Sequence, residues 1–279
     1  VNKWEDKFDV FATGRKDFSG NRANFFKLYD LLSESYDSLM EWASPDVIIH
    51  CAAITDVDYC QNNPDQAIAM NAESVNKFLQ SRTAGRLIFI SSDAVFSDGI
   101  NMASEKSTTE PENVYGTSKI LGEKYISLSG NHDVAVRTTI VGKNINLEHQ
   151  GFVEWIINSV QDGKEITLFE DAIFTPITIW SLADELEWIM ENDYSGIIHI
   201  AGTEAISKYD FGRKICDGLG LDSSLILSGS IDLVPFEAKR SKDQTLDSSY
   251  YQQLSGRTLP NMAETIDLII QNFERYTYA

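Results

Sequence analysis

Two residues with complementary chemistry stand four positions apart in the segment Tyr115-Gly116-Thr117-Ser118-Lys119. Residues at this spacing share one face of an α-helix, so the phenol and the ammonium can act together. An unperturbed tyrosine has a pKa of about 10, too high for efficient proton donation near neutral pH, and a neighbouring cation lowers it. The pair indicates an acid–base centre, although the same spacing also occurs on ordinary amphipathic helix surfaces.

A second polar motif strengthens this interpretation. The apolar run 87–90 has the pattern of a buried strand and ends in Ser-Ser-Asp at 91–93. Folds with parallel strands bind ligands beyond the carboxyl ends of those strands, so the hydroxyls would face a ligand there. We therefore predict that Ser92, Tyr115 and Lys119 form one catalytic set. The alternatives are a helix-capping or turn serine and a packed aromatic residue.

The elements that must position these residues can be read from the hydrophobic pattern. Strands are predicted over 9–13, 47–53, 87–91, 134–139 and 197–201, and helices over 38–43, 64–80 and 114–128. This alternation predicts an α/β fold of the Rossmann type, with a doubly wound parallel sheet and helices on both faces.

The pattern changes after about residue 143, where irregular segments mix with further helices. These helices are predicted over 152–160, 182–190, 208–219 and 262–273, and segment 98–113 is predicted to be a surface loop. We expect a smaller α+β lobe that binds substrate. The predicted boundaries are 1–145 and 177–202 for the dinucleotide-binding domain, and 146–176 and 203–279 for the substrate-binding lobe.

One expected motif is absent from the sequence: no glycine-rich turn joins a strand to a helix. In dinucleotide-binding folds this turn follows the central first strand and holds the pyrophosphate. We expect that about 15–20 residues, enough for a strand, a turn and most of a helix, precede Val1 in the native chain. A native start at Val1 after removal of methionine is the alternative.

Charge and composition restrict the partners. Forty-two acidic against 23 basic residues give a net charge of −19, which would repel nucleic acid and anionic membranes. An anionic ligand must therefore be held by locally placed cations. The apolar runs are too short to cross a bilayer, which takes about 20 residues.

The cysteines and histidines indicate neither a disulfide framework nor a metal site. Three cysteines without metal-ligand spacing fit a reducing cytoplasm, and Cys51, within an apolar run, is expected in the core. The polar N-terminus lacks the apolar region of a secretion signal, so we predict a cytoplasmic protein. The four histidines show no ligand spacing, and no metal is expected.

The segments 91–96 (SSDAVF) and 115–123 (YGTSKILGE) together resemble the extended short-chain dehydrogenase/reductases. Within that superfamily the chain is most similar to the dTDP-4-dehydrorhamnose reductases, and the similarity covers nearly the whole chain. It includes residues 45–58, which resemble the fourth strand of that family, and Asn71, Arg137, Gly142, 174–177, 239–240 and 246–247.

The resemblance implies a role for each catalytic residue. Tyr115 would protonate the C4 oxygen of a 4-ketosugar as hydride arrives from the nicotinamide, Lys119 would bind the cofactor ribose and tune Tyr115, and Ser92 would hydrogen-bond the carbonyl. Arg15 follows the strand 9–13, where NAD enzymes tend to have an acid, and an arginine there can accept a 2′-phosphate. NADP(H) is therefore favoured over NAD(H).

The resemblance also implies two sets of binding residues. Besides Arg15, Tyr115 and Lys119, the cofactor is expected to contact Asp30, Leu31, Ala52, Ala53, Thr55 and Asn71. The nucleotide-linked sugar is expected to contact Val57, Asp93, Trp155 and Arg240.

Three departures from the reductase pattern leave the sugar open. Ala94 stands where the family usually has tyrosine, Ser241 stands where a proline follows the arginine, and 60–61 (Cys-Gln) replaces a more acidic stretch. A dehydratase would place Asp-Glu after the hydroxyl residue, and the absence of this glutamate counts against dehydration.

The predicted function is NADPH-dependent reduction of a nucleotide-linked 4-ketosugar for deoxysugar and surface-polysaccharide synthesis. An NAD-dependent sugar-nucleotide epimerase is the first alternative, because it would use the same triad but keep its nicotinamide tightly bound. A regulatory cofactor-binding subunit is the second, since the β subunit of methionine adenosyltransferase resembles the same reductases. Relatives commonly form dimers, so a homodimer is one assembly to consider.

Overall fold

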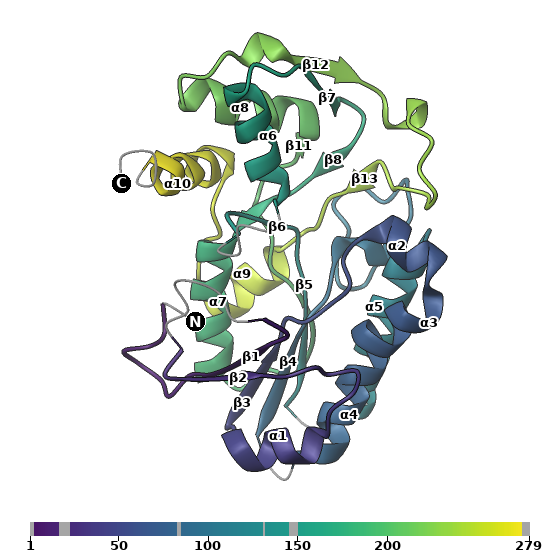
Figure 1. Ribbon diagram of the computed structural model, residues 1–279, viewed down its shortest axis with the longest axis vertical. Coiled ribbons are helices and arrows are strands. Elements are labelled where there is room, and N and C mark those ends of the chain that lie inside the picture. Colours follow the sequence, from purple (N-terminus) through teal and green to yellow (C-terminus); the bar gives the residue numbers. More distant parts are fainter. Residues whose placement is uncertain (1–2, 17–22, 83–84, 131, 145–149, 275–279) are drawn as a thin grey trace.

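The computed structural model describes residues 3–16, 23–82, 85–130, 132–144 and 150–274. Its centre is a parallel four-stranded sheet in the order β10-β5-β4-β3, with β3 Val47–His50, β4 Arg86–Ile90, β5 Val134–Arg137 and β10 Gly196–His199 (Figure 1). Two further parallel strands, β1 Phe11–Gly14 and β2 Phe25–Leu28, form a separate small sheet. Among the described strands, β3 pairs with β4 alone.

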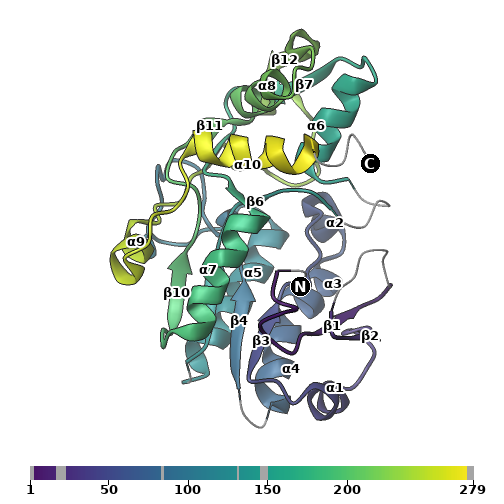
Figure 2. The same ribbon diagram turned by 90° about the vertical axis from the view of Figure 1, so that its left-hand side faces the viewer.

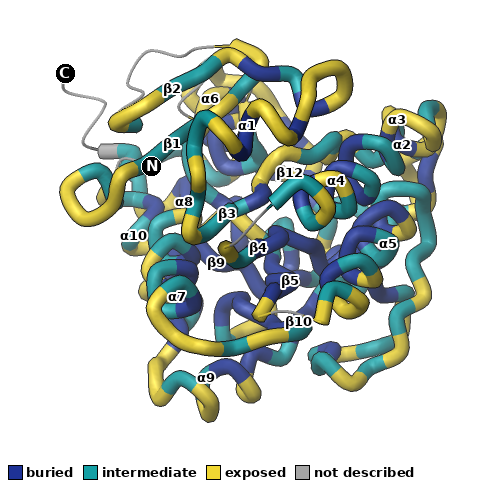
Figure 3. The backbone as a smooth tube through the Cα atoms, turned by 90° about the horizontal axis from the view of Figure 1, so that it is seen from below, coloured by how far each residue is buried: buried dark blue, intermediate teal, exposed yellow. Residues whose placement is uncertain are grey.

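The central strands alternate their side chains between two cores, as a pleated strand requires. Leu87 and Phe89 of β4 point into one cluster, which includes Phe78 and Ile126 from the helices on that face. Their neighbours in β4 point into a second cluster on the opposite face. Figure 3 shows this buried centre of the sheet enclosed by more exposed helices. The expected doubly covered Rossmann-type sheet is confirmed.

Helices cover both faces of this sheet (Figure 2). The first face carries α1 Tyr36–Ala43, α4 Ser74–Ser81 and α5 Val114–Leu128, with α2 Val57–Asn62 and α3 Pro64–Ile68 near the carboxyl ends of the strands. The second face carries α7 Ile179–Glu191 and α9 Ser249–Ser255. Helix α9 packs here through Tyr251, although it comes from the segment that we assigned to the substrate lobe.

The remaining elements form the second lobe, which lies above the carboxyl ends of the central strands in Figure 1. Its helices are α6 Phe152–Gln161, α8 Lys208–Gly218 and α10 Met262–Glu274. Its strands are β7 Ile166–Phe169, β8 Ile173–Phe174, β11 Ile206–Ser207, β12 Ile226–Gly229 and β13 Asp243–Gln244, while β6 Ile140–Val141 and β9 Ile177–Thr178 pair at the junction. The described residues also include three short 3₁₀ turns, η2 Asp93–Val95, η3 Ser223–Leu225 and η4 Ile231–Leu233.

Two local expectations were wrong. The strand predicted over 47–53 ends at His50, so Cys51 begins the following loop and is exposed rather than in the core. The single helix predicted over 64–80 is interrupted by a turn of π-helix, η1 Ala69–Glu73, between α3 and α4. Such π turns occur often at functional sites, and this one carries Asn71.

No helix in the described part of the chain is long and apolar enough to cross a bilayer. In the same residues, no cluster of three or more histidine, cysteine or acidic side chains could hold a metal ion.

Candidate active site

Ser92 lies at the point where β4 ends, as the sequence pattern predicts. It caps η2: its Oγ accepts a hydrogen bond from the backbone N–H of Ala94 at 3.2 Å and donates to Asp93 Oδ1 at 2.7 Å. Thr139 donates to the other carboxylate oxygen of Asp93 at 2.8 Å. Burial raises the pKa of Asp93, while the two hydroxyl groups oppose the shift. Asp93 therefore fixes the position of Ser92.

Tyr115 and Lys119 occupy successive turns at the start of α5, which begins where Asn113 caps it. The side chain of Asn113 accepts the backbone N–H of Gly116 at 2.9 Å. The ammonium of Lys119 donates to the carbonyl of Ile90 at 3.0 Å and lies 5.9 Å from the centroid of the Tyr115 ring. The lysine is thus anchored to the last residue of β4 and faces the tyrosine.

Gly116 lets α5 approach the polypeptide that follows Ser92. A Cβ atom at this position would collide with the carbonyl oxygen of Ala94 and lie 2.8 Å from Pro111 Cβ. This close approach places Tyr115 near enough for the hydroxyl of Ser92 to act on its phenol. All three predicted catalytic residues are therefore brought together.

The electrostatics of the pair differ in part from the prediction. Burial raises the pKa of Tyr115, and the neighbouring hydroxyl of Ser92, rather than the charge of Lys119, opposes the rise. The phenol is therefore protonated at neutral pH, the state that a proton donor needs. Burial lowers the pKa of Lys119 to about 8, and nearby Cys51 and Glu123 oppose this shift.

A buried polar network lies behind the catalytic helix. Glu123 accepts hydrogen bonds from Ser91 Oγ at 2.6 Å and from Arg137 at 2.9 and 2.7 Å. Arg137 Nη1 lies 3.3 Å from His199 Nε2, and His199 Nδ1 lies 3.0 Å from the carbonyl of Ala103. Arginine has no acceptor, so Nε2 must accept and Nδ1 must carry the proton. The sequence motif identified Glu123 and Arg137 without revealing that they form an ion pair.

A cavity of about 420 Å³ opens beside the catalytic residues, between the two lobes. Ala94 and Asn113, which lie two positions from Ser92 and Tyr115 along the chain, form part of its wall. Three of the four predicted substrate residues line it, and Asp93 instead lies behind Ser92. The lining comprises Val57, Ala94, Phe96, Glu112, Asn113, Phe152, Trp155, Thr167, Leu168, Phe169, Lys208, Ile231, Phe236, Arg240, Ser241 and Gln244.

Two cations line this cavity. Arg240 forms an ion pair with Asp58 at 2.9 Å, and its guanidinium lies 4.9 Å from the Phe236 ring centroid. Lys208 begins α8, and sequence reasoning missed it because a single lysine in a helical pattern has no distinguishing spacing. The sequence signal that bears on Lys208 is the general argument that so acidic a chain must hold an anionic ligand with local cations. A second hollow of about 440 Å³, lined in part by Asp184 and Glu264, contains none of the predicted site residues.

The residues predicted to bind the cofactor fall into two groups. Ala52 and Thr55 are exposed and Ala53 is half-buried in the loop that follows β3, and Arg15 is exposed just after β1. These positions fit the expected cofactor edge at the carboxyl ends of the strands. Within the described residues, the guanidinium of Arg15 and the ammonium of Lys119 provide donors for phosphate and ribose. The sequence supplies no glycine-rich turn for the pyrophosphate.

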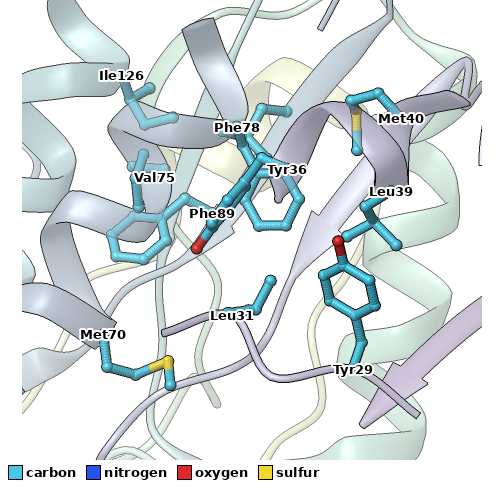
Figure 4. Close-up of a cluster of buried hydrophobic side chains, with 12 residues drawn as sticks. Tyr29, Leu31, Tyr36, Leu39, Met40, Met70, Val75, Phe78, Phe89 and Ile126 are labelled. Atoms are coloured by element: carbon cyan, nitrogen blue, oxygen red, sulfur yellow. The ribbon is translucent and has the colours of Figure 1, made fainter. Parts of the chain in front are cut away.

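The other predicted cofactor residues have structural partners. Leu31 is buried in the hydrophobic cluster shown in Figure 4, to which Met70 also belongs, so its side chain serves the core. Asp30 accepts the backbone N–H of Leu32 at 3.0 Å. Asn71 is fully buried and joins the backbone of Ile54, at 2.8 and 2.9 Å, to Ser118 Oγ at 2.9 Å. Its polar atoms therefore hold the loop after β3 against α5.

Comparison with known proteins gives consistent similarity over most of the chain. Residues 4–275 match the family described as RmlD substrate binding domain. A probable low-salt glycan biosynthesis reductase of Haloferax volcanii is 28% identical over 251 residues, which cover 88% of this chain and 83% of that protein. Methionine adenosyltransferase 2 subunit beta of Rattus norvegicus is 29% identical over 247 residues, covering 85% of this chain and 73% of the relative.

A solved structure shares the fold. The dTDP-4-dehydrorhamnose reductase from Bacillus anthracis, in complex with NADP, superposes with a TM-score of 0.84 at 23% identity, covering 94% of this chain and 98% of that one. Because the family match spans nearly every residue, the chain belongs to the RmlD substrate binding domain family, within the extended short-chain dehydrogenase/reductases that its motifs resemble.

Proposed function

We propose that this oxidoreductase of the short-chain type uses NADPH to reduce the keto group of a nucleotide-linked 4-ketosugar, for the synthesis of a deoxysugar in a surface polysaccharide. The observation that carries the proposal is the meeting of Ser92 and Tyr115 beside a cavity lined by Lys208 and Arg240. Two hydroxyl groups suit a ketone oxygen, and two cations suit a diphosphate. The Haloferax volcanii reductase supports a role in glycan synthesis.

The chain's own residues would handle the proton. NADPH, when bound, supplies the hydride. Tyr115 is protonated at neutral pH and would donate its hydroxyl proton to the oxygen of the ketone. In the free protein the single hydroxyl proton of Ser92 is donated in a hydrogen bond to Asp93. The hydroxyl must therefore rotate before it can donate a hydrogen bond to the ketone oxygen. Lys119 would bind the cofactor ribose with the donors that it does not use on Ile90.

Arg15 supports the preference for NADPH over NADH. Its exposed side chain follows β1, where a guanidinium can pair with a 2′-phosphate. The Bacillus anthracis reductase was solved in complex with NADP. Ala52, Ala53 and Thr55 would line the same edge, with Asp30 and Leu31 near the adenine through their backbone. We place Asn71 as a positioning residue of that edge, because its side chain is fully buried.

Val57, Trp155 and Arg240 would contact the substrate from the cavity wall, and Asp93 would act indirectly by orienting Ser92. The reducing cytoplasm is the compartment in which we place the reaction, as the cysteine content suggests. A homodimer is the assembly that we would test first, by light scattering.

The test is the decrease of NADPH absorbance with dTDP-4-keto-6-deoxy-L-mannose, compared between the wild type and Tyr115→Phe. We expect oxidation by the wild type and a loss of at least about 100-fold in the variant, the usual contribution of a positioned acid. Tyr250→Phe, an exposed tyrosine on α9, is the matched control. NADPH binding without any oxidation by the wild type would rule out this substrate.

A regulatory cofactor-binding role is the second candidate. The observation that favours it is the similarity to methionine adenosyltransferase 2 subunit beta, which is 29% identical over 247 residues. Recovery of a synthetase partner by the tagged protein, without turnover of ketosugars, would favour this role. Tightly bound NAD that copurifies with the protein would instead favour an epimerase.

A further inference from the structure

Lys208 is the first residue of α8, after Ser207, which caps the helix. Its ammonium lies 5.8 Å from the ring centroid of Phe152 and 6.0 Å from that of Phe174, so two aromatic faces flank it. The same side chain lines the 420 Å³ cavity that Arg240 also lines. Lys208 thus presents a positive charge from a largely apolar wall.

The charge of Lys208 is less compensated than that of Arg240. Arg240 pairs with Asp58 at 2.9 Å, whereas the described residues offer no carboxylate within ion-pair distance of the Lys208 ammonium. Asp93 is the acidic group that acts on Lys208 electrostatically, but its two oxygens are hydrogen-bonded to Ser92 and Thr139. Burial lowers the pKa of Lys208, and Asp93 opposes that shift only in part.

A partly desolvated cation without a close counter-ion is costly, and an anion that enters the cavity removes much of that cost. The protein as a whole carries a charge of −19 and repels such an anion. Recognition of an anionic ligand must therefore come from a cation inside the cavity. Lys208 meets this requirement because it is accessible from the cavity and has spare donors.

We propose that Lys208 is a specificity-determining residue, whose ammonium binds an anionic oxygen of the ligand and so selects charged sugar nucleotides over neutral sugars. The inference rests on the proposed function only in taking the cavity as the sugar-nucleotide site. The anionic oxygen belongs either to the diphosphate or to a carboxylate on the sugar. Either group would place a single oxyanion against the ammonium of Lys208. The ligands compared in the experiment below distinguish the diphosphate from the carboxylate.

The experiment is calorimetric titration of dTDP, UDP-glucose and UDP-glucuronic acid into the wild type and Lys208→Met. Methionine retains an apolar stem against Phe152 and Phe174 but removes the charge. We expect binding to weaken by roughly 10- to 100-fold, as for a lost hydrogen bond to a charged group. Loss for all three ligands assigns Lys208 to the diphosphate, and loss for UDP-glucuronic acid alone assigns it to a sugar carboxylate.

Two further variants serve as controls for the loss of charge at Lys208. Lys208→Arg keeps the charge and should retain affinity within a few fold, while Lys164→Met removes an exposed charge outside the cavity and should have no effect. Circular dichroism establishes that each variant is folded, and Lys208→Gln replaces the methionine variant if that one is not. Unchanged affinity for every ligand in a folded, uncharged variant, or no binding by the wild type, would overturn the proposal. The titrations measure binding and not turnover. Their outcome can therefore be interpreted even if the reductase assay fails.

Discussion

The hydroxyl of Ser91 donates a hydrogen bond of 2.6 Å to Glu123 Oε1, which joins the end of β4 to α5. One helical turn earlier, Lys119 binds the carbonyl of Ile90, the preceding residue of the strand. Two successive turns of one helix face therefore hold Ile90, the last residue of β4, and Ser91, which follows it. Ser92 follows directly, so its position relative to the helix depends on these two contacts as well as on its own bond with Asp93.

The buried ion pair of Glu123 and Arg137 gives a first prediction about stability. Glu123→Gln leaves the arginine charge buried without its counter-charge, and the free energy of unfolding should fall by about 3–5 kcal/mol. The double variant Glu123→Gln, Arg137→Met removes both charges and should recover most of that loss. Urea unfolding followed by circular dichroism measures both. If Glu123→Gln lowered the free energy of unfolding by less than about 1 kcal/mol, Glu123 and Arg137 would not be acting as a buried charge pair.

Lys119 gives a prediction about pH. Its pKa is lowered to about 8, chiefly by burial, so the ammonium loses its proton as the pH rises through about 8. If the charged lysine holds the cofactor ribose, kcat/KM for ketone reduction should be level near neutral pH and fall above about pH 8, tenfold per unit at the limit. Stopped-flow NADPH oxidation across the pH range measures this. A level profile up to about pH 10 would mean that Lys119 does not titrate in the free enzyme.

The sequence alone could predict those elements of the fold that are specified by local signals. Helix α5 has the bounds Val114–Leu128 that we predicted, because its N-cap asparagine and apolar spacing are both local features. The π turn Ala69–Glu73 could not be predicted, since its side chains keep an ordinary helical spacing. The exposure of Cys51 likewise depends on where β3 ends. That end could not be located from the sequence, because apolar residues continue into the following loop.

The site shows the same division between local and distant information. Ser92 and Tyr115 each belong to a compact motif, and their meeting follows from the parallel sheet. The cavity joins Val57, Trp155 and Arg240, which lie far apart in the chain, and only the packing of the second lobe brings them together. The general charge argument required local cations but could not select Lys208, because its neighbours Phe152 and Phe174 are supplied by other elements.

The two buried histidines predict acid sensitivity. Burial lowers the pKa of His50 and of His199 to about 3, so the folded protein binds neither proton until far below the pH at which the unfolded chain binds both. Stability is therefore full above about pH 6.5 and is lost as the pH falls toward about 3, by up to about 1.4 kcal/mol per pH unit for each histidine. Unfolding by urea between about pH 5 and pH 7 measures the slope, because most carboxylates titrate lower.

A pair of variants separates the histidine contribution. His50→Asn should reduce the slope by up to about 1.4 kcal/mol per pH unit, because one of the two protonation differences disappears. His132→Asn replaces an exposed histidine and is the matched control. An unchanged slope in the His50 variant would show that this ring takes up its proton equally in both states.

Gly116 gives the last prediction, which tests the close approach of α5 to the catalytic serine. In Gly116→Ala the new methyl group would meet the carbonyl of Ala94 and Pro111 Cβ, so the helix must move away from the segment that carries Ser92. Displacing the acid by about 1 Å is enough to lower kcat roughly 100-fold. Lys124→Ala, on the exposed face of the same helix, should retain activity. If Gly116→Ala were as active as this control, the contact between Tyr115 and Ser92 would not depend on the glycine, and the loop after β4 would have to yield instead.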